Sequence, residues 1–338
     1  MKRVWILCEG SQGHVVQSRG LARELAKVVN LQVDEIPARL VVPSGFVRPL
    51  VKRLLHRWHW DWLFRITHSV GTIPVGKPDL LIASGPRAML ALEHLSQTFG
   101  CPAVFVQGTV EVPENTFTAV MRPFEGQTRG DFIFIPLLFT DITPELVDAA
   151  ANDFLTENSI LPKGPVNTLL IGASSAKIRF SQDDWIGIIR MVNDLWKRDG
   201  SQWLIATSSR TGRELEELLR NGIDPAAILE AVWYSHAPRK ATKAFLGLAD
   251  RVFVTLDSLT MLTEAVASGR PTCALCPAGL SEERSNTHLQ YTLGLAANGF
   301  ISRTQPGRET EPPPMPPAAP VDYSGAIREL IARLQWNA

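Results

Sequence analysis

The feature that most constrains this fold is an alternation that runs along the chain twice. Short, continuously apolar segments rich in Val, Ile and Leu alternate with longer segments of amphipathic helical periodicity. Continuous apolar strands separated by helices are typical of parallel sheets that are buried on both faces. The alternation breaks at residues 158–165, "NSILPKGP", where proline and glycine cluster as in a linker. We therefore predict an α/β fold with two doubly wound, Rossmann-like parallel-sheet domains facing a cleft.

The expected elements follow from this alternation. In the first half we expect strands at 4–8, 31–36, 79–83, 103–107, 118–121 and 132–135, with helices at 12–29 and 86–99. In the second half we expect strands at 168–172, 203–206, 231–234, 251–255 and 271–275, with helices at 182–197, 211–220, 240–248, 258–268 and 286–298.

A proline-rich stretch separates the last helix from the rest of the chain. The segment "TQPGRETEPPPMPPAAPVD" contains seven prolines and should be extended. It leads to a helix expected at 323–335. The predicted organisation is a first domain at 1–158, a second at 166–303, a linker at 304–322, and a terminal segment at 323–338 whose helix docks on the first domain.

The charge balance and the lengths of the apolar runs exclude several classes of binding partner and location. The 34 Lys and Arg residues balance 34 Asp and Glu residues, so no global field attracts nucleic acid. No apolar run is long enough to predict a membrane span, and "VWILC" is too short for a signal peptide. We therefore expect a cytoplasmic protein with four reduced cysteines. Because no Asp-x-Asp motif is present, we expect no metal and no other cofactor.

Two loops in the second half have the composition of phosphate-binding loops. "GASSAK" (172–177) and "TSSRTG" (207–212) each follow a predicted strand and combine small hydroxyl residues with one cation. Small residues let backbone N–H groups approach a phosphate, and the cation neutralises it. The alternative interpretation is that the Ser and Thr residues only cap helices.

A third stretch, "TLDSLTMLTEAVASGRP" (255–271), adds a carboxylate. Asp257 or Ser258 can cap the helix, and Glu264 follows in its second turn. A carboxylate has two acceptor oxygens and can hold both hydroxyls of a ribose. The alternative is a solvated helical glutamate.

The segment "RPLVKRLLHRWHWDWLFRITH" (48–68) is both basic and aromatic. Interleaved cations and tryptophans on a helix are typical of a segment that lies in a membrane interface. We therefore predict a membrane or acceptor face comprising Arg48, Lys52, Arg53, Arg57, Trp58, Trp60 and Trp62. The alternatives are a helix packed on the domain with its aromatics inward, and a binding site for single-stranded nucleic acid.

These motifs carry a family resemblance. The stretch 255–271 resembles the Asp-Ser…Glu-Ala…Gly-x-Pro block of GT-B glycosyltransferases, whose glutamate takes the nucleotide ribose, and "EGSQGH" resembles their first glycine-rich loop. A closer resemblance is to the family named after a mitochondrial-fission factor of the "elongated mitochondria" type. It rests on "GSQGHVVQSRGLARELA", "PDLLIASGPRAMLALEHL", "LLIGASSAKIRFS", "LIATSSRTGRELEELL" and "FLGLADRVFVTLDSLTMLTEAVASGRPTCAL". Two segments depart from the family pattern, "HAPRKATKAFLGLAD" and "VQGTVEVPENTF".

The resemblance implies a GT-B fold with an acceptor-side first domain and a second domain that binds a nucleotide sugar. It implies that Gly10 and Gly13 approach the donor, and that His14 acts as general base or as a phosphate hydrogen-bond donor. The alternative for His14 is a helix cap, and Glu9 and Glu111 are the other candidate bases. The predicted nucleotide-sugar site comprises Gly10, Gly13, Gly172, Ser174, Ser175, Lys177, Ser208, Ser209, Arg210, Asp257, Ser258, Met261 and Glu264.

The predicted function is a metal-independent glycosyltransferase that uses a nucleoside-diphosphate sugar in cell-envelope glycan or glycolipid synthesis. Its acceptor would be lipid-linked or lipopolysaccharide at the inner face of the membrane, and no nucleic acid would be involved. Two alternatives stay open at this point. One is a sugar-nucleotide epimerase on the same fold, and the other is a non-catalytic interaction protein that kept the scaffold.

Overall fold

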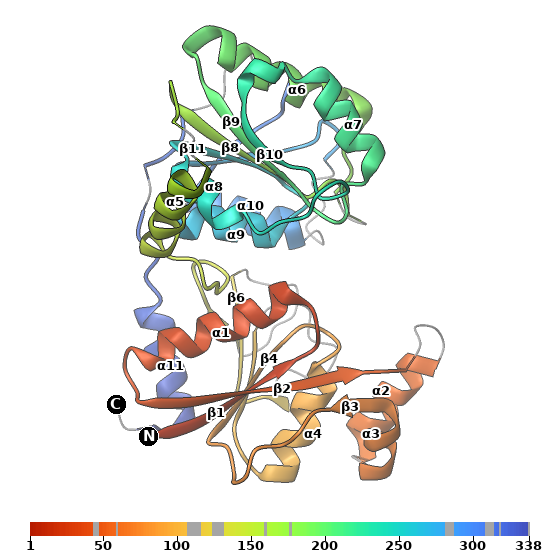
Figure 1. Cartoon of the computed structure of the whole chain (residues 1–338). Helices are drawn as coiled ribbons and strands as arrows, with labels where there is room; N and C mark the ends of the chain where they lie inside the picture. The colour runs from red at the N-terminus through yellow and green to blue at the C-terminus, as the bar shows by residue number, and fades with distance from the viewer. Residues whose placement is uncertain are drawn as a thin grey trace. The chain divides into compact units, whose positions relative to one another are not determined.

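A computed structural model divides the chain into two compact units, which we describe separately (Figure 1). Unit 1 comprises Met1–Asp141 and Asp322–Ala338, and unit 2 comprises Ile142–Val321. The structure describes residues 1–42, 47–58, 60–106, 116–123, 132–158, 161–175, 178–280, 287–307, 314–317 and 319–336. The side chains of Gln12, Lys52, Thr287 and residues 47–50 lie outside this description.

Unit 1 is built on a seven-stranded sheet in the order β3-β2-β1-β4-β5-β6-β7. Every neighbouring pair is parallel except β2 with β3. The strands β1, β4, β5 and β6 are almost entirely buried, which explains their continuous apolar sequences. The strands are β1 (Lys2–Cys8), β2 (Leu31–Leu40), β3 (His68–Val70), β4 (Leu80–Ser84), β5 (Ala103–Val106), β6 (Ala119–Arg122) and β7 (Phe132–Phe134).

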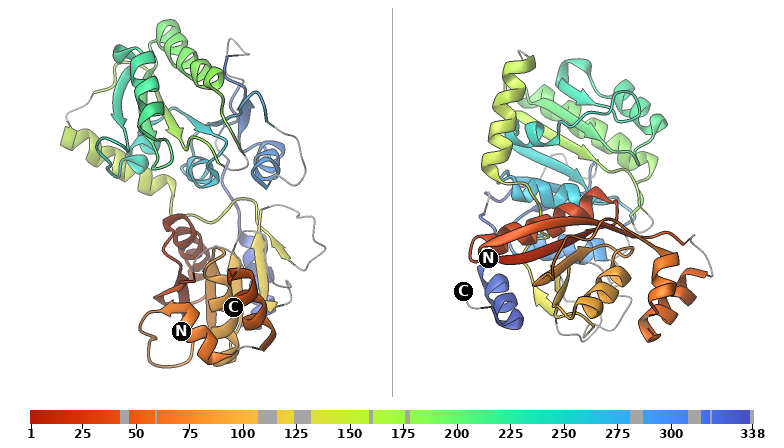
Figure 2. Two further views of the ribbon diagram at one scale, coloured as in Figure 1. Left: turned by 90° about the vertical axis from the view of Figure 1, so that its right-hand side faces the viewer. Right: turned by 60° about the horizontal axis from the view of Figure 1, so that its bottom comes forward.

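The helices of unit 1 are α1 (Gln12–Ala26), α2 (Val47–Trp58), α3 (Asp61–Thr67), α4 (Met89–Phe99) and α11 (Ser324–Leu334). The terminal helix α11 lies in unit 1, where it contacts β7, the edge strand of the sheet (Figure 2). The Tyr323 hydroxyl, just before α11, donates to the Leu138 carbonyl at 3.2 Å, and its ring stacks on Phe139. These contacts attach the end of the chain to the first unit.

Unit 2 is built on a six-stranded, fully parallel sheet in the order β10-β9-β8-β11-β12-β13. The strands are β8 (Val166–Ile171), β9 (Gln202–Thr207), β10 (Ile228–Val232), β11 (Arg251–Thr255), β12 (Thr272–Leu275) and β13 (Ser302–Thr304). The helices are α5 (Pro144–Asn158), α6 (Gln182–Asp199), α7 (Arg213–Gly222), α8 (Thr242–Leu248), α9 (Leu259–Ala267) and α10 (Thr287–Ala297).

The boundary between the units falls earlier than the sequence predicts. The sequence analysis placed the end of the first domain at residue 158, but the chain divides between Asp141 and Ile142. The reason is the packing of α5 on α8, which Figures 1 and 2 show side by side. Phe154 meets Phe245 edge to face at 5.7 Å, and Asp148 pairs with Arg270 at 2.5 Å. The proline- and glycine-containing stretch 158–165 therefore joins α5 to β8 within unit 2.

The predicted fold class is confirmed, because both units are doubly wound sheets with interleaved helices. In each sheet the strand order reverses between two adjacent strands. These are β1 and β4 in unit 1, and β8 and β11 in unit 2. Ligands of open parallel sheets bind beyond the carboxyl ends of the strands at such a reversal point. The candidate sites are therefore sought at the loops after β1, β4, β8 and β11.

Candidate functional site

In unit 2, three of the predicted loops meet at the reversal point. Gly172 follows β8, and its N–H donates to the Thr255 hydroxyl at the end of β11 at 2.8 Å. The Ser208 hydroxyl, after β9, donates to the Gly172 carbonyl at 2.7 Å. Thr211 joins them, because its hydroxyl accepts from Ser208 N–H and donates to the Ile171 carbonyl. The carboxyl edge of this sheet is thus one hydrogen-bonded assembly.

An ion pair lies directly over Gly172. The Arg210 guanidinium is 2.9 Å from Oδ2 of Asp257, whose side chain is fully buried, while Arg210 is 43% exposed. A Cβ on Gly172 would lie 2.4 Å and 2.8 Å from the two carboxylate oxygens and 2.8 Å from the guanidinium. Only glycine therefore lets Arg210 reach Asp257 at this position.

The Asp257 carboxylate is poorly compensated for a buried charge. Neither oxygen accepts a hydrogen bond of regular geometry from a described residue, and Arg210 is held by charge and proximity. Burial raises the pKa of Asp257 above its ordinary value, although the Thr255 hydroxyl and Arg210 act in the opposite direction. An anion that bound to the exposed Arg210 would weaken the compensation of the buried Asp257 charge.

The first loop is strained at its second residue. Ala173 is buried and has a φ of 107°, a region that favours glycine. The hydroxyls of Ser174 and Ser175 accept the N–H groups of Phe180 and Ile178, so both serines close their own loop. Lys177, the predicted cation of this loop, lies outside the described residues.

Two helices begin beside this cluster. Ser258, and not Asp257, caps α9, because its hydroxyl accepts the N–H of Met261 at 3.5 Å. Glu264 is half-buried in the second turn of α9. Helix α7 has Gly212 as its N-cap and therefore no side-chain cap, and the exposed Ser209 and Arg210 lie shortly before it. An uncapped helix start next to a cation is an environment that favours a bound anion.

In unit 1, a histidine and a carboxylate pair at the equivalent place. Glu9 follows β1, and its Oε1 lies 2.5 Å from Nδ1 of His14, in the first turn of α1. Its other oxygen accepts the N–H groups of Arg87 and Ala88 at 2.6 and 3.2 Å, in the loop after β4. The Glu9 side chain is buried, whereas the His14 side chain is 30% exposed. We call Glu9 and His14 the dyad.

The surroundings keep Glu9 ionised. Burial alone would raise the pKa of Glu9, but the hydrogen bond and charge of His14 and the two backbone N–H groups outweigh it and lower the pKa below its ordinary value. An ionised carboxylate against Nδ1 favours the tautomer with the proton on Nδ1 and leaves Nε2 free to accept a proton. This orientation suits a general base.

A glycine missed by the sequence analysis makes the dyad possible. Gly85, in "ASGPRAM", has a φ of 93°, and a Cβ there would lie 2.3 Å from Nδ1 of His14 and 2.5 Å from Oε1 of Glu9. Gly10 also has a positive φ, of 99°, with open space at its Cβ, and Gly13 lies in the first turn of α1. Glu111 lies outside the described residues.

The predicted membrane or acceptor face lies on α2 and α3. Arg53 and Arg57 are exposed, and so are the tryptophans Trp58, Trp60 and Trp62. The side chains of Arg48 and Lys52 lie outside the description. Within the described part of the chain, no helix has the length and apolar character needed to cross a membrane.

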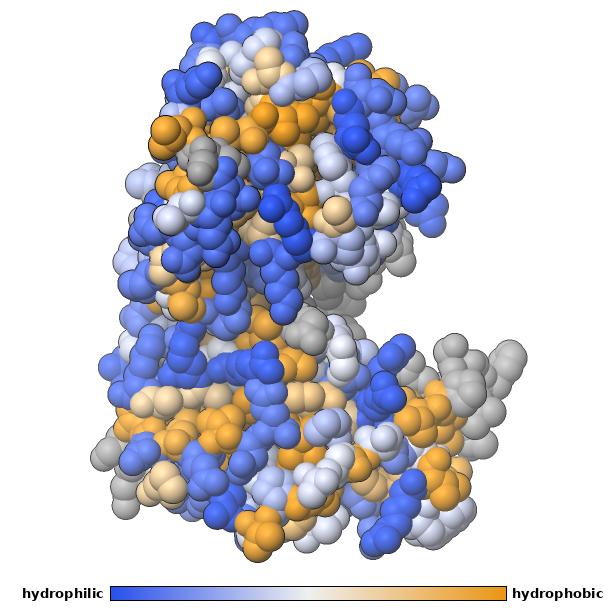
Figure 3. Space-filling model, viewed as in Figure 1, coloured by the Kyte–Doolittle hydropathy of each residue, from blue (hydrophilic) through white to orange (hydrophobic). Residues whose placement is uncertain are grey.

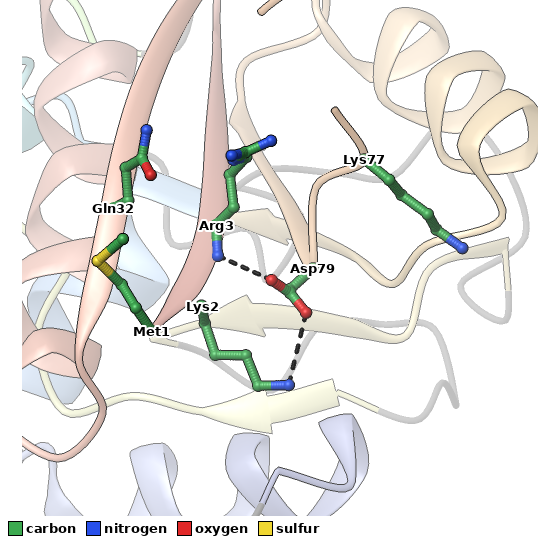
Figure 4. A pocket seen from close by; sticks show the side chains of 6 residues that line it. All are labelled: Met1, Lys2, Arg3, Gln32, Lys77 and Asp79. Atoms are coloured by element: carbon green, nitrogen blue, oxygen red, sulfur yellow. Dashed lines mark hydrogen bonds and ion pairs between the residues drawn. The ribbon is translucent and has the colours of Figure 1, made fainter. Parts of the chain in front are cut away.

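One open cavity lies at the opposite edge of the unit 1 sheet (Figure 4). Its volume is about 280 Å³, and Met1, Lys2, Arg3, Gln32, Lys77 and Asp79 line it at the amino ends of β1, β2 and β4. Asp79 already accepts the Arg3 N–H at 2.8 Å and pairs with Lys2 at 3.5 Å. The cavity is therefore remote from the carboxyl ends where the dyad lies.

The cysteines form no disulfide. Cys8, Cys101, Cys273 and Cys276 are free thiols, and all but Cys8 are buried. Burial raises the pKa of Cys276, so the Cys-x-x-Cys pair has no activated thiol at that position. Among the residues that the structure describes, no three His, Cys, Asp or Glu side chains converge as metal ligands would.

Comparison with known proteins places these sites in context. The family model described as mitochondrial fission ELM1 matches residues 12–321. The chain resembles E. coli ADP-heptose lipopolysaccharide heptosyltransferase II with a TM-score of 0.50 and 12% identity, covering 99% of both chains. It resembles S. aureus MnaA solved with UDP, at a TM-score of 0.52 and 9% identity, over 92% of this chain and 86% of that chain.

A third solved structure has the same fold. It is a putative UDP-N-acetylglucosamine 2-epimerase from Listeria monocytogenes, with a TM-score of 0.51 and 12% identity over 98% of this chain and 88% of that one. No curated protein matches the chain significantly in sequence. At these identities the likeness shows the fold, which is the GT-B fold that glycosyltransferases share with nucleotide-sugar epimerases.

Proposed function

The chain belongs to the mitochondrial fission ELM1 family, and from that premise we propose that it is a glycosyltransferase of the GT-B type that uses a nucleoside-diphosphate sugar. The observation that carries the proposal is the cluster of Gly172, Arg210 and Asp257 at the reversal point of the unit 2 sheet. It combines a bare backbone, an exposed cation and an uncapped helix start, which together fit a diphosphate.

On the donor side, each group has a stated role. Arg210 and the N–H groups at the start of α7 bind the diphosphate and stabilise the charge that develops on it as the sugar leaves. Ser208 and Thr255 fix the backbone of Gly172, so the loop keeps its shape before the ligand arrives. Glu264, half-buried on α9, accepts hydrogen bonds from the ribose hydroxyls.

On the acceptor side, the dyad supplies the base. His14 takes the proton of the acceptor hydroxyl on Nε2, while the acceptor oxygen bonds to the anomeric carbon of the sugar. The bond between that carbon and the diphosphate oxygen breaks, and its electron pair stays on the diphosphate. Glu9 holds the His14 ring and stabilises the imidazolium that forms. Glu9 is thus a positioning residue, and His14 is the catalytic one.

The acceptor that we propose is a lipid-linked or lipopolysaccharide glycan of the cell envelope. The support for it is the basic and aromatic surface of α2 and α3, which lies in the same unit as the dyad. Such an acceptor would place the protein at the inner face of the membrane.

The test begins with a thermal-shift panel of nucleoside diphosphates and their sugars. A ligand at about 100 times its Kd should stabilise the protein by about 2.7 kcal/mol. Arg210→Ala and Glu264→Ala should abolish or reduce this shift, whereas Arg220→Ala and Glu217→Ala, at exposed positions farther along α7, should retain it. The absence of a shift with every nucleotide, in a folded wild-type protein, would overturn the proposal.

The ligand found in this way then decides the reaction. Incubation with the nucleotide sugar and an acceptor extract should release nucleoside diphosphate only when the acceptor is present. Conversion of the sugar nucleotide into an isomer without any acceptor would identify an epimerase instead. Binding without turnover in either assay would favour a non-catalytic interaction protein.

A further inference from the structure

The strongest feature outside the two sites is a stack of three exposed tryptophans. Trp58 ends α2, Trp60 precedes α3, and Trp62 lies in the first turn of α3. The ring centroids of Trp58 and Trp60 are 5.1 Å apart and those of Trp60 and Trp62 are 5.8 Å apart, with interplanar angles of 10° and 23°. Their exposed fractions are 52%, 39% and 58%. We call these three residues the tryptophan ladder.

The ladder is not part of the core of unit 1. Helices α2 and α3 form an insertion between β2 and the edge strand β3, as Figure 1 shows. They bury Val51, Leu55, Leu63 and Phe64 against the rest of the unit. These side chains, and not the tryptophans, therefore pack the two helices onto the unit. The alternative that the aromatic residues of this segment face inward is correct for Phe64 but not for the three tryptophans. Three large indoles left in water call for an external partner.

The surface around the ladder is cationic. Arg53, Arg57 and Arg65 are exposed, and none of them forms an ion pair within the described part of the chain. The one acidic residue of α3, Asp61, lies 3.1 Å from His94 of α4. Ile66 adds an apolar side chain that is 65% exposed. Figure 3 shows apolar and strongly polar residues next to each other over this part of unit 1.

Two histidine–carboxylate contacts connect this insertion to α4. His56 of α2 lies 2.6 Å from Glu93 of α4, and His94 of α4 pairs with Asp61 of α3. Phe64 stacks on His94 with a centroid separation of 3.9 Å. The loop directly before α4 donates the N–H groups of Arg87 and Ala88 to Glu9. The insertion that carries the ladder is therefore attached to the helix whose preceding loop holds Glu9.

We propose that the tryptophan ladder and its arginines dock unit 1 on the surface of a membrane containing anionic phospholipids. Indoles prefer the interface between headgroups and acyl chains, and each exposed arginine gains about 1 kcal/mol near an anionic surface. The interaction is peripheral, because the described apolar side chains of α2 and α3 other than the ladder and Ile66 pack against the core of the unit. This docking does not depend on the proposed transferase activity.

The stacking itself argues against single-stranded nucleic acid as the partner. A protein binds successive bases by offering open aromatic ring faces. Because Trp60 stacks against both neighbours, its ring faces are used within the ladder. The indole edges and one ring face each of Trp58 and Trp62 remain available, which leaves no continuous row of open ring faces for successive bases. The zero formal net charge of the chain agrees with a local membrane surface, not with a general polyanion site.

The experiment is flotation of the full chain with phosphatidylglycerol-containing vesicles and with pure phosphatidylcholine vesicles. We expect binding to the anionic vesicles and quenching of tryptophan fluorescence when the acyl chains carry bromine. Trp58→Ser combined with Trp62→Ser should weaken binding by about tenfold or more. Arg57→Gln and Arg65→Gln should each weaken it by about fivefold.

Matched variants lie in unit 2. Tyr234→Ser and Leu161→Ser remove exposed apolar side chains, and Arg213→Gln and Arg220→Gln remove exposed charges, so all four should float like the wild type. A nucleotide thermal shift that persists in the tryptophan variant would separate loss of docking from loss of the donor site. Equal behaviour on neutral and anionic vesicles, no flotation, tryptophan-dependent binding of an oligonucleotide, or a tryptophan-dependent dimer in sedimentation would each overturn the proposal.

Discussion

Each unit carries a buried carboxylate at the reversal point of its sheet, and the two carboxylates are used in opposite ways. In unit 1 Glu9 follows the first strand, accepts hydrogen bonds on both oxygens, and has a lowered pKa. In unit 2 Asp257 follows the strand across the reversal point, lacks regular hydrogen bonds from described residues, and has a raised pKa. Glu9 is thus a fully hydrogen-bonded carboxylate that orients a base. The charge of Asp257, in contrast, is balanced by the half-exposed Arg210.

This difference indicates which groups are preorganised and which can exchange. The dyad is locked by backbone N–H groups and by the absence of a side chain at Gly85, so it needs no ligand to complete it. Arg210 is half in solvent and can give up Asp257 for a phosphate. Both arrangements depend on a glycine at a strand end, Gly85 for the dyad and Gly172 for the pair of Arg210 and Asp257. Each arrangement can therefore be disrupted separately by substituting its own glycine.

The largest effect is expected for Gly85→Ala. The added Cβ would be 2.3 Å from His14 Nδ1 on a backbone with positive φ, so we expect a loss of about 2–4 kcal/mol in the free energy of unfolding and loss of the dyad. The control is Gly10→Ala, which has a similar φ but open space and should cost about 1 kcal/mol. Urea unfolding of both variants measures the difference, and equal losses would show that sterics at the dyad are unimportant.

The next effect is on catalysis by Glu9→Gln. Its amide oxygen can replace Glu9 as acceptor for Arg87 and Ala88, which leaves its NH₂ facing Nδ1 and moves the histidine proton to Nε2. We expect kcat to fall by about 10²-fold with little change in KM. Nitrogen chemical shifts of the His14 ring would report the tautomer directly. Glu24→Gln, at a buried carboxylate within α1, should change neither quantity.

A smaller effect is a proton linked to ligand binding in unit 2. A diphosphate near Arg210 should raise the already raised pKa of Asp257 further, so the protein takes up as much as about one proton on binding. Affinity should then rise as the pH falls between the pKa values of the free and the bound state, by at most about tenfold per pH unit. Asp257→Asn should remove this contribution.

Calorimetry in two buffers of different ionisation enthalpy measures the protons exchanged. The nucleotide phosphate also titrates, so the difference between the wild type and Asp257→Asn isolates the carboxyl group. Equal proton uptake by both proteins would place the ligand away from Asp257.

The smallest effect concerns the strained loop residue. Ala173→Gly should relieve the cost of a φ of 107° and stabilise the protein by up to about 1 kcal/mol. If the strain holds the loop for the ligand, nucleotide affinity should fall several-fold at the same time. Ala241→Gly, at a φ of −118°, should instead destabilise the protein by about 0.5–1 kcal/mol. A destabilised Ala173→Gly variant would contradict the strain.

Much of the fold could be read from residue patterns that act over short distances. The apolar runs of β1, β4, β8 and β11 are continuous because both faces of their sheets are buried, and this made the doubly wound architecture predictable. The short edge strands β3 and β13 have no such run and were missed. Helix α5 has helical periodicity but was not assigned. The proline- and glycine-containing break that follows it placed the predicted domain boundary after this helix, whereas the units divide before it.

For the candidate sites, too, local features could be predicted from the sequence and non-local contacts could not. Strand-end loops with glycine, serine and one cation identified Gly172, Ser208, Arg210 and Asp257, because loop composition is local. Their pairing is not local: Arg210 meets Asp257 only because the parallel order brings the ends of β9, β8 and β11 to one edge. Local residue patterns are thus enough to predict the two doubly wound sheets and the loops that hold the candidate sites. The room that Gly85 leaves for the dyad, the strain at Ala173 and the outward position of the three tryptophans depend on the folded chain, because burial and charge compensation involve neighbours that are distant in the sequence.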